Sequence, residues 1–160
     1  MNVKSKNIRI RHAQGSEKEL MQIAVLYKEL NILQADMGMS IRLVADGEKL
    51  WVDSMSKLLG KYSQIIIAEN HYNIVGFSAG VIRVLPPYYG NAVIGFWDSM
   101  YIIKEFRGLG IGDSMTQMLL HWWRKKGAVL VEGERLSVND NAKGNYERLG
   151  FREEIVKYRK

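Results

Sequence analysis

The feature that most constrains this chain is Arg107 followed by glycines at 108, 110 and 112. This run lies between a strand-like apolar segment, residues 92–103, and a segment with helical spacing, residues 109–126. The first N–H groups of a helix have no acceptor within the helix, and glycines let a ligand approach the main chain closely. The run therefore predicts an anion-binding turn, helped by the dipole of the helix that follows.

Two other phosphate-binding loops do not match this spacing. A P-loop requires a Gly-Lys-Ser/Thr sequence that is absent here, and the dinucleotide fingerprint requires its third glycine where Asp113 stands. The turn also follows several hairpin-like strands, whereas a dinucleotide site lies after the first strand of an alternating array. A plain connection between a strand and a helix remains the alternative for an isolated turn of this kind.

Composition excludes several classes of protein. The 160 residues, of which 47% are hydrophobic, predict one domain covering residues 1–160. The chain has no cysteine, so disulfides, thiolate zinc sites and a cysteine nucleophile are excluded, and no metal site is predicted. The net charge of +6 favours an anionic ligand. Nucleic acid is a less favoured partner because no base-stacking motif or helix-turn-helix pattern accompanies the charge.

The chain shows no membrane or export signal. No run of about 18 apolar residues occurs, and residues 1–11 are polar and charged where a signal peptide needs an apolar centre. We therefore expect no membrane partner and a cytoplasmic location.

Hydrophobic spacing predicts ten elements. We expect strands at residues 7–12, 64–69, 74–85, 92–103, 128–138 and 151–158, and helices at residues 16–34, 47–59, 109–126 and 139–149. Ser16 and Glu19 form a predicted capping box at the first helix. The second helix is expected to bury Leu50 or Trp51, with Met55 and Leu58, and the third to bury Met115, Met118, Trp122 and Trp123. This order defines an α+β fold.

Two motifs resemble one known family. Arg107-x-x-Gly110-x-Gly112, with Phe106 before it, resembles the coenzyme A signature of the GNAT N-acetyltransferase superfamily. Downstream, the segment from Asn139 through Ala142 and Tyr146-Glu147-Arg148-Leu149-Gly150-Phe151 is similar to the second half of that pattern. One departure is that Leu136-Ser137-Val138 runs directly into Asn139, where the family often has intervening residues.

The resemblance implies a GNAT-like fold and a site. The fold would have a mixed, mostly antiparallel central sheet of about six or seven strands flanked by about four helices. Acetyl-CoA would be the cosubstrate, and a backbone N–H near Tyr101 or Ile102 would polarise the thioester. Tyr146 would protonate the leaving thiolate, although a half-buried tyrosine packing on the sheet is the alternative. The expected cofactor-binding residues are Met100, Tyr101, Ile102, Arg107, Gly108, Leu109, Gly110, Ile111, Gly112, Asp113 and Asn139.

Transfer to an amine also requires a base. Asp98 lies on the strand before the turn among Phe96, Trp97 and Met100, so it is the first candidate, with a hydrogen-bond acceptor at a strand edge as the alternative. Glu134 ranks below it. The three histidines, His12, His71 and His121, form no ligand or triad pattern and receive no role. Tyr88 and Tyr89, in a hairpin connection, are weak acceptor-site candidates.

These expectations define three functions. The first is an N-acetyltransferase that uses direct attack by a primary amine of a small molecule, peptide or protein. The second is a non-catalytic acyl-CoA-binding regulatory module, and the third is a basic nucleic-acid-binding domain. The oligomeric state stays open, with a homodimer among the options.

Overall fold

The computed structural model describes residues 7–160. Its strands and helices follow the predicted order up to the fourth helix. They are β1 (Ile8–His12), α1 (Glu17–Asp36), α2 (Gly47–Lys57), β2 (Ser63–Asn70), β3 (Asn73–Val84), β4 (Val93–Ile102), α3 (Ile111–Lys125), β5 (Leu130–Gly133) and α4 (Asp140–Arg148). Two short 3₁₀ turns, Pro87–Tyr89 and Lys104–Phe106, precede and follow β4.

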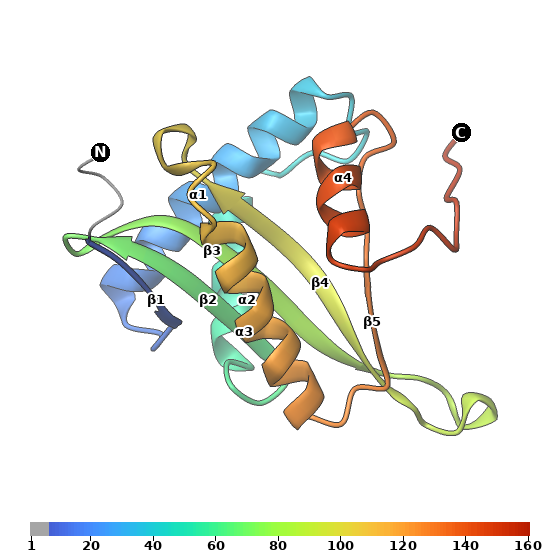
Figure 1. The fold of residues 1–160 in the computed structure, drawn as a ribbon. Helices are drawn as coiled ribbons and strands as arrows, with labels where there is room; N and C mark the ends of the chain where they lie inside the picture. Colours follow the sequence, from blue (N-terminus) through green and yellow to red (C-terminus); the bar gives the residue numbers. More distant parts are fainter. Residues whose placement is uncertain (1–6) are drawn as a thin grey trace.

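The five strands form one sheet in the order β1-β2-β3-β4-β5 (Figure 1). Strands β1 to β4 pair antiparallel, and β5 pairs parallel to β4. Helices α1 and α2 cover one face of the sheet and α3 covers the other, while α4 stands beside the end of β4 and β5 (Figure 1). The sheet therefore separates two apolar cores.

Each core contains fully buried side chains. Ile23, Ile65 and Phe77 lie in the core beneath α1 and α2, and Met115 and Trp123 lie beneath α3. The indole N–H of Trp123 donates to the carbonyl of Val81 at 3.0 Å. The expected packing of α3 is thus confirmed for Met115, Trp122 and Trp123, and Met118 is partly buried beside them.

Helix α2 packs differently from its expected pattern. Met55 is buried and Trp51 packs against the core, but Leu50 and Leu58 are exposed. The expectation for Leu58 was wrong because α2 ends at Lys57, so that Leu58 follows the last helical turn. Trp51, rather than Leu50, is the inward residue of that pair.

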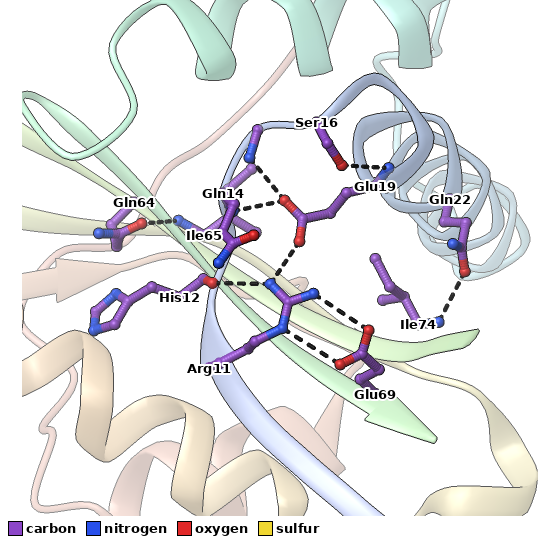
Figure 2. Close-up of polar contacts among 11 residues, drawn as sticks. Arg11, His12, Gln14, Ser16, Glu19, Gln22, Gln64, Ile65, Glu69 and Ile74 are labelled. Atoms are coloured by element: carbon purple, nitrogen blue, oxygen red, sulfur yellow. Dashed lines mark hydrogen bonds and ion pairs between the residues drawn. The ribbon is translucent and has the colours of Figure 1, made fainter. Parts of the chain in front are cut away.

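A polar network fixes the start of α1 (Figure 2). The Glu19 carboxylate accepts hydrogen bonds from the backbone N–H groups of Gln14 (2.6 Å) and Gly15 (2.7 Å) and from Arg11 (2.7 Å). Arg11 also donates to Glu69 on β2 at 3.2 and 3.3 Å. Ser16 caps the N–H of Glu19 as expected, but the Glu19 side chain reaches Gln14 and Gly15 instead of completing the box on Ser16. The network ties β1, α1 and β2 together.

The C-terminal part of the sheet is smaller than expected. A sheet of six or seven strands was wrong, because the described residues form five strands and residues 151–160 form none. Strand β5 covers four residues instead of residues 128–138, because the chain leaves β4 after Gly133. The short β5 offers little edge to a further strand, and ion pairs of Arg135 with Glu153 and of Glu134 with Lys157 hold the tail instead.

The Arg11 network leads to a stability prediction. In Arg11→Met the carboxylates of Glu19 and Glu69 lose their shared cation while largely buried, with side chains 6% and 16% exposed. We expect a loss of roughly 2–3 kcal/mol in the free energy of unfolding. Lys57→Met, which breaks the exposed pair with Asp53, is the control and should cost below about 1 kcal/mol. Urea unfolding measures both, and equal losses would contradict a special role for Arg11.

Candidate active site

The site begins where β4 and β5 separate. The two strands pair from Ile94 and Leu130 to Trp97 and Gly133, where β5 ends. On the other side of β4, Trp97 pairs with Gly80 and Ser99 with Ala79, so Asp98 has no partner on β3 and forms a β-bulge. A bulge bends a strand and increases its local twist. The last five residues of β4 therefore follow β3 while their other edge is open.

The bulge also determines which backbone groups face that open edge. The N–H of Ile103 donates to Val75 on β3, and the carbonyl of Ile102 accepts instead from the Arg107 side chain. Because alternate residues of a strand direct their N–H and C=O groups to opposite sides, the groups of Tyr101 face β3 and those of Met100 and Ile102 face the opening. Two N–H donors without a bonded partner in the described part of the chain consequently lie along this edge.

A cavity occupies the opening. It is bounded by β4 from Trp97 to Met100, by residues 134–136 after β5, by α4, and by Leu30 and Gln34 of α1. Asp98 and Tyr146, the two candidate catalytic residues, both line it, and so do Met100, Glu134 and Asn139. Asp98 and Tyr146 are 48 residues apart in the sequence. The fold thus brings the predicted base and the predicted acid to one cavity.

The glycine turn lies at the far end of the open edge. Gly110 is the N-cap of α3 at φ 75°, and Gly108 has φ 76°, a left-handed region that favours glycine. Ile111 is buried and Leu109 is partly buried beneath the turn, which anchors it to the core. No side chain of residues 7–160 caps α3, so its first N–H groups are available to a ligand.

Arg107 connects the turn to β4. Its Nε donates to the carbonyl of Ile102 at 2.8 Å, and its guanidinium lies 5.5 Å from the centre of the Tyr101 ring. The rest of the exposed guanidinium can therefore meet an anion beside the α3 N-terminus. Asp113, in the first turn of α3, pairs with Arg148 of α4 at 2.6 Å, which holds the two ends of the site together.

Asp98 is held by two donors. Its Oδ2 accepts from the Trp51 indole N–H at 3.2 Å and from the Ser99 hydroxyl at 3.0 Å. Although solvent reaches part of the side chain, surrounding protein desolvates the carboxylate, which raises its pKa above the ordinary aspartate value. The bonds from Ser99 and Trp51 and the charge of Arg83 act in the opposite direction. A carboxylate with a raised pKa is a better proton acceptor than a free one.

Tyr146 is fixed between two aromatic rings. Trp97 and Phe151 meet its ring edge-on, each with centroids 5.2 Å away, and its hydroxyl donates to the carbonyl of Glu134 at 3.2 Å. Desolvation, with a smaller effect from the Glu134 charge, raises the pKa of Tyr146 to about 12. The phenol thus keeps its proton throughout the neutral range.

The remaining candidates lie in less direct positions. The Asn139 side chain caps α4 by accepting from the N–H of Ala142 at 3.0 Å, which starts the helix that carries Tyr146. Glu134 pairs with Lys157 at 2.6 Å. Tyr88 and Tyr89 are exposed at the tip of the β3–β4 hairpin, which projects beyond the end of the sheet, and neither lines the cavity (Figure 1).

Sequence reasoning did not identify the two residues that hold Asp98. Ser99 is adjacent to Asp98, so its proximity was visible, but a serine in a strand carries no signal of its own. Trp51 is 47 residues away from Asp98. It was predicted only as an alternative to Leu50 in the core. Local sequence spacing does not indicate that a side chain of α2 contacts β4.

The described chain, residues 7–160, also lacks two features. No group of three or more metal-ligating side chains occurs there. Among the same residues, no helix is both long and apolar enough to span a membrane.

Comparison with known proteins identifies the class. A family model described as an acetyltransferase (GNAT) domain matches residues 61–153. N-alpha-acetyltransferase 30 of Schizosaccharomyces pombe is 35% identical over 75 residues, which are 47% of this chain and 50% of that protein. The chain thus aligns with about half the length of this relative.

Solved structures share the fold over nearly the whole chain. The aminoglycoside N-acetyltransferase AAC(6')-Iy in complex with CoA is 19% identical, with a TM-score of 0.75 over 96% of this chain and 95% of that one. The same enzyme with a bisubstrate CoA analogue is 18% identical, with a TM-score of 0.75 over 97% and 99%. At this identity, the likeness establishes the fold. The family match covers more than half of the chain, which therefore belongs to the GNAT acetyltransferase family.

A close approach between Gly133 and Tyr146 gives a prediction for this site. A Cβ at residue 133 would collide with the Tyr146 hydroxyl and lie 3.0 Å from Cε1 of the ring. We expect Gly133→Ala to lower the free energy of unfolding by about 1–3 kcal/mol. Gly144→Ala, on α4 with open space around it, should instead raise it by up to about 1 kcal/mol.

A double mutant isolates the contact. Because the hydroxyl is the nearest atom, Tyr146→Phe should recover much of the stability lost in Gly133→Ala. Chemical denaturation of the single and double variants measures this coupling. Strictly additive effects would mean that the hydroxyl does not lie against Gly133.

Proposed function

We propose that the chain transfers the acetyl group of acetyl-CoA to a primary amine by direct attack, through a tetrahedral intermediate. The observation that carries this proposal is the cavity between β4 and α4, which Asp98, Tyr146 and Met100 of the open β4 edge line together. The family match and the CoA complexes of structural neighbours support the choice of cosubstrate.

In this proposal the turn of residues 107–112 binds the pyrophosphate. The N–H groups at the start of α3, the helix dipole and the Arg107 guanidinium all favour negative charge at one place. The pantetheine arm then follows the open edge of β4, where the N–H groups of Met100 and Ile102 have no bonded partner among residues 7–160. The thioester arrives beside Asp98 because the edge leads from the turn to the bulge.

The backbone donors of the edge would stabilise the oxyanion. Tyr101 directs its N–H toward β3, so the N–H of Met100 or Ile102 is the donor that the geometry offers to the thioester carbonyl. Fixed donors aimed at developing charge are commonly among the largest contributions to catalysis. Such a donor leaves no trace in the amino-acid sequence, since every non-proline residue carries it.

Asp98 would take the proton of the amine. An ammonium group becomes a nucleophile only after losing a proton, and a primary amine of lysine type has a pKa of about 10.4 against about 3.9 for an ordinary aspartate. Desolvation of Asp98 narrows this gap by raising the pKa of the carboxyl. The neutral amine then attacks the carbonyl carbon and the C–N bond forms. As the intermediate collapses, the C–S bond breaks, the sulfur takes the Tyr146 proton, and the nitrogen loses its second proton, which restores the Tyr146 phenol.

Tyr146 would supply the proton that the thiolate of CoA requires. The phenol lines the same cavity as Asp98 and is protonated far above neutral pH. Its raised pKa makes it a weaker acid than free tyrosine, so transfer is favourable only while the C–S bond is breaking and negative charge accumulates on sulfur. Tyr146 thus also acts as a hydrogen-bond donor to the leaving group.

The acceptor is a primary amine of a small molecule or of a peptide or protein. The names of the relatives span both kinds, an N-alpha-acetyltransferase and aminoglycoside acetyltransferases. The alternative, an acyl-CoA-binding regulatory module, predicts CoA binding without turnover on any amine. Purified protein assayed for CoA release against a panel of amines separates the two functions, and turnover on at least one amine class is expected.

The phosphate turn gives a binding prediction. Gly110→Val should lower CoA affinity at least tenfold, because its side chain would stand where the pyrophosphate approaches the backbone. Gly127→Val is the matched control, since Gly127 has φ 80° and open space at the other end of α3. It carries the same backbone strain away from the turn and should bind CoA normally. Calorimetric titration measures both, and an equal loss would refute the proposed pyrophosphate site.

The role of Tyr146 gives a kinetic prediction. Tyr146→Phe keeps the ring and removes the proton, so kcat should fall about a hundredfold while CoA affinity is nearly unchanged. Because the pKa is raised to about 12, the wild-type acid stays protonated and kcat should show no basic limb from this group up to about pH 10. Wild-type kcat in Tyr146→Phe, with chemistry rate-limiting, would contradict the assignment.

A further inference from the structure

Asp98 carries an asymmetric set of hydrogen bonds. The indole N–H of Trp51, on α2, and the hydroxyl of Ser99 both donate to Oδ2. No donor among the described residues, 7–160, is bonded to Oδ1. One carboxylate oxygen is therefore saturated with donors from the protein, while the other has its lone pairs free.

We propose that Trp51 positions Asp98 for catalysis. The indole N–H of Trp51 fixes Oδ2 of Asp98, which leaves Oδ1 as the oxygen that takes the proton of the amine. This inference rests on the proposed function. It assigns a role in the acetyl transfer to a residue of α2, a helix that lies outside both CoA-binding motifs.

Trp51 is itself held in one orientation. Its ring stacks on Tyr27 of α1 with centroids 3.9 Å apart and planes 5° from parallel, and it meets Phe77 of β3 at 5.7 Å. A ring clamped on two sides has few rotamers to lose when its N–H makes a bond, so little entropy opposes the contact with Asp98. The packing of α1 and α2 on the sheet thus determines where the Asp98 carboxylate is held.

The position of Asp98 explains why such support is needed. A bulge residue lacks a cross-strand partner, and the terminal torsion of an aspartate is broad, so neither the ladder nor the rotamer defines where each oxygen points. Two donors on one oxygen remove that freedom. Ser99 alone, as the neighbour in the chain, moves with the bulge, whereas Trp51 fixes the carboxylate to a separate element.

The charged groups around Asp98 do not duplicate this function. Arg83 of β3 lowers the pKa of Asp98, but its guanidinium lies over the Phe96 ring and pairs with Glu132 of β5 at 3.2 Å. On the α1 side Tyr27 faces Asp98, and its pKa is raised by desolvation and by the Asp98 charge. Across the cavity Glu134 pairs with Lys157, and Arg135, which also lines the cavity, pairs with Glu153.

The test replaces the indole N–H while keeping an aromatic ring. Trp51→Phe can still stack on Tyr27, so we expect acceptor KM to be nearly unchanged and kcat to fall about tenfold at neutral pH, the usual size of a lost hydrogen bond to a charged group. The bond from Trp51 lowers the pKa of Asp98, so its loss should move the acidic limb of the kcat/KM profile to higher pH. Trp122→Phe, on α3 in the other core, is the control and should move neither quantity.

A second readout does not depend on turnover. The indole N–H resonance of Trp51 in a ¹H–¹⁵N spectrum should shift as Asp98 titrates, and this dependence should vanish in Asp98→Asn. A pH-independent indole resonance in the wild type would overturn the pairing, whatever the kinetics show. A pH-dependent resonance together with an unmoved acidic limb in Trp51→Phe would overturn the positioning role.

The two proposals fail in different ways. Wild-type protein that binds CoA but transfers acetyl to no amine refutes the proposed function and, with it, the catalytic use of Trp51. Wild-type turnover with full kcat retained in Trp51→Phe refutes the positioning role alone.

Discussion

The site depends on the β-bulge at Asp98, where β4 leaves β5 and keeps its pairing with β3. The extra residue follows Trp97, where the parallel ladder ends, and it has two consequences. It turns the N–H groups of Met100 and Ile102 toward the opening, and it places an aspartate at the point of divergence. The opening exposes backbone donors that a continuous sheet would satisfy internally. An unpaired strand edge inside a fold costs stability unless something else binds it, which is why we infer a ligand there.

The ends of this open edge have complementary chemistry. At one end, the uncapped start of α3 and Arg107 present partial and full positive charge to an anion. At the other end, Asp98 and Tyr146 have pKa values raised by desolvation, which makes the carboxylate a stronger base and keeps the phenol protonated. In the proposed function, a phosphate group anchored at the first end would bring the reacting thioester to the second. Binding energy from the part of CoA that does not react thereby orients the part that does.

Local sequence patterns predict much of the candidate site, but they do not predict the contacts that depend on long-range packing. The glycines at 108 and 110 adopt left-handed backbone, and the pattern of residues 109–126 is helical, so the glycine turn and the helix after it follow from short-range rules. Asp98 and Tyr146 were found through their neighbours in the chain and the family motif. The bulge could not be predicted, because it depends on the register of β4 against β3. Trp51 could not be assigned to Asp98, because only the packing of α1 and α2 places it there.

At the end of the sheet, local sequence predicts a strand that the fold does not form. Residues 151–158 alternate enough to predict a strand, yet they form none, because a strand needs an edge to pair with and β5 has only four residues.

The central claim, that CoA binds along the open edge of β4, is tested most directly by amide hydrogen exchange with and without saturating CoA. The account predicts slowed exchange at Met100, Ile102 and residues 108–113, with no change at Tyr101 and Ile103, which face β3 in the free protein. Unchanged exchange at Met100 and Ile102 in a protein saturated with CoA would contradict it.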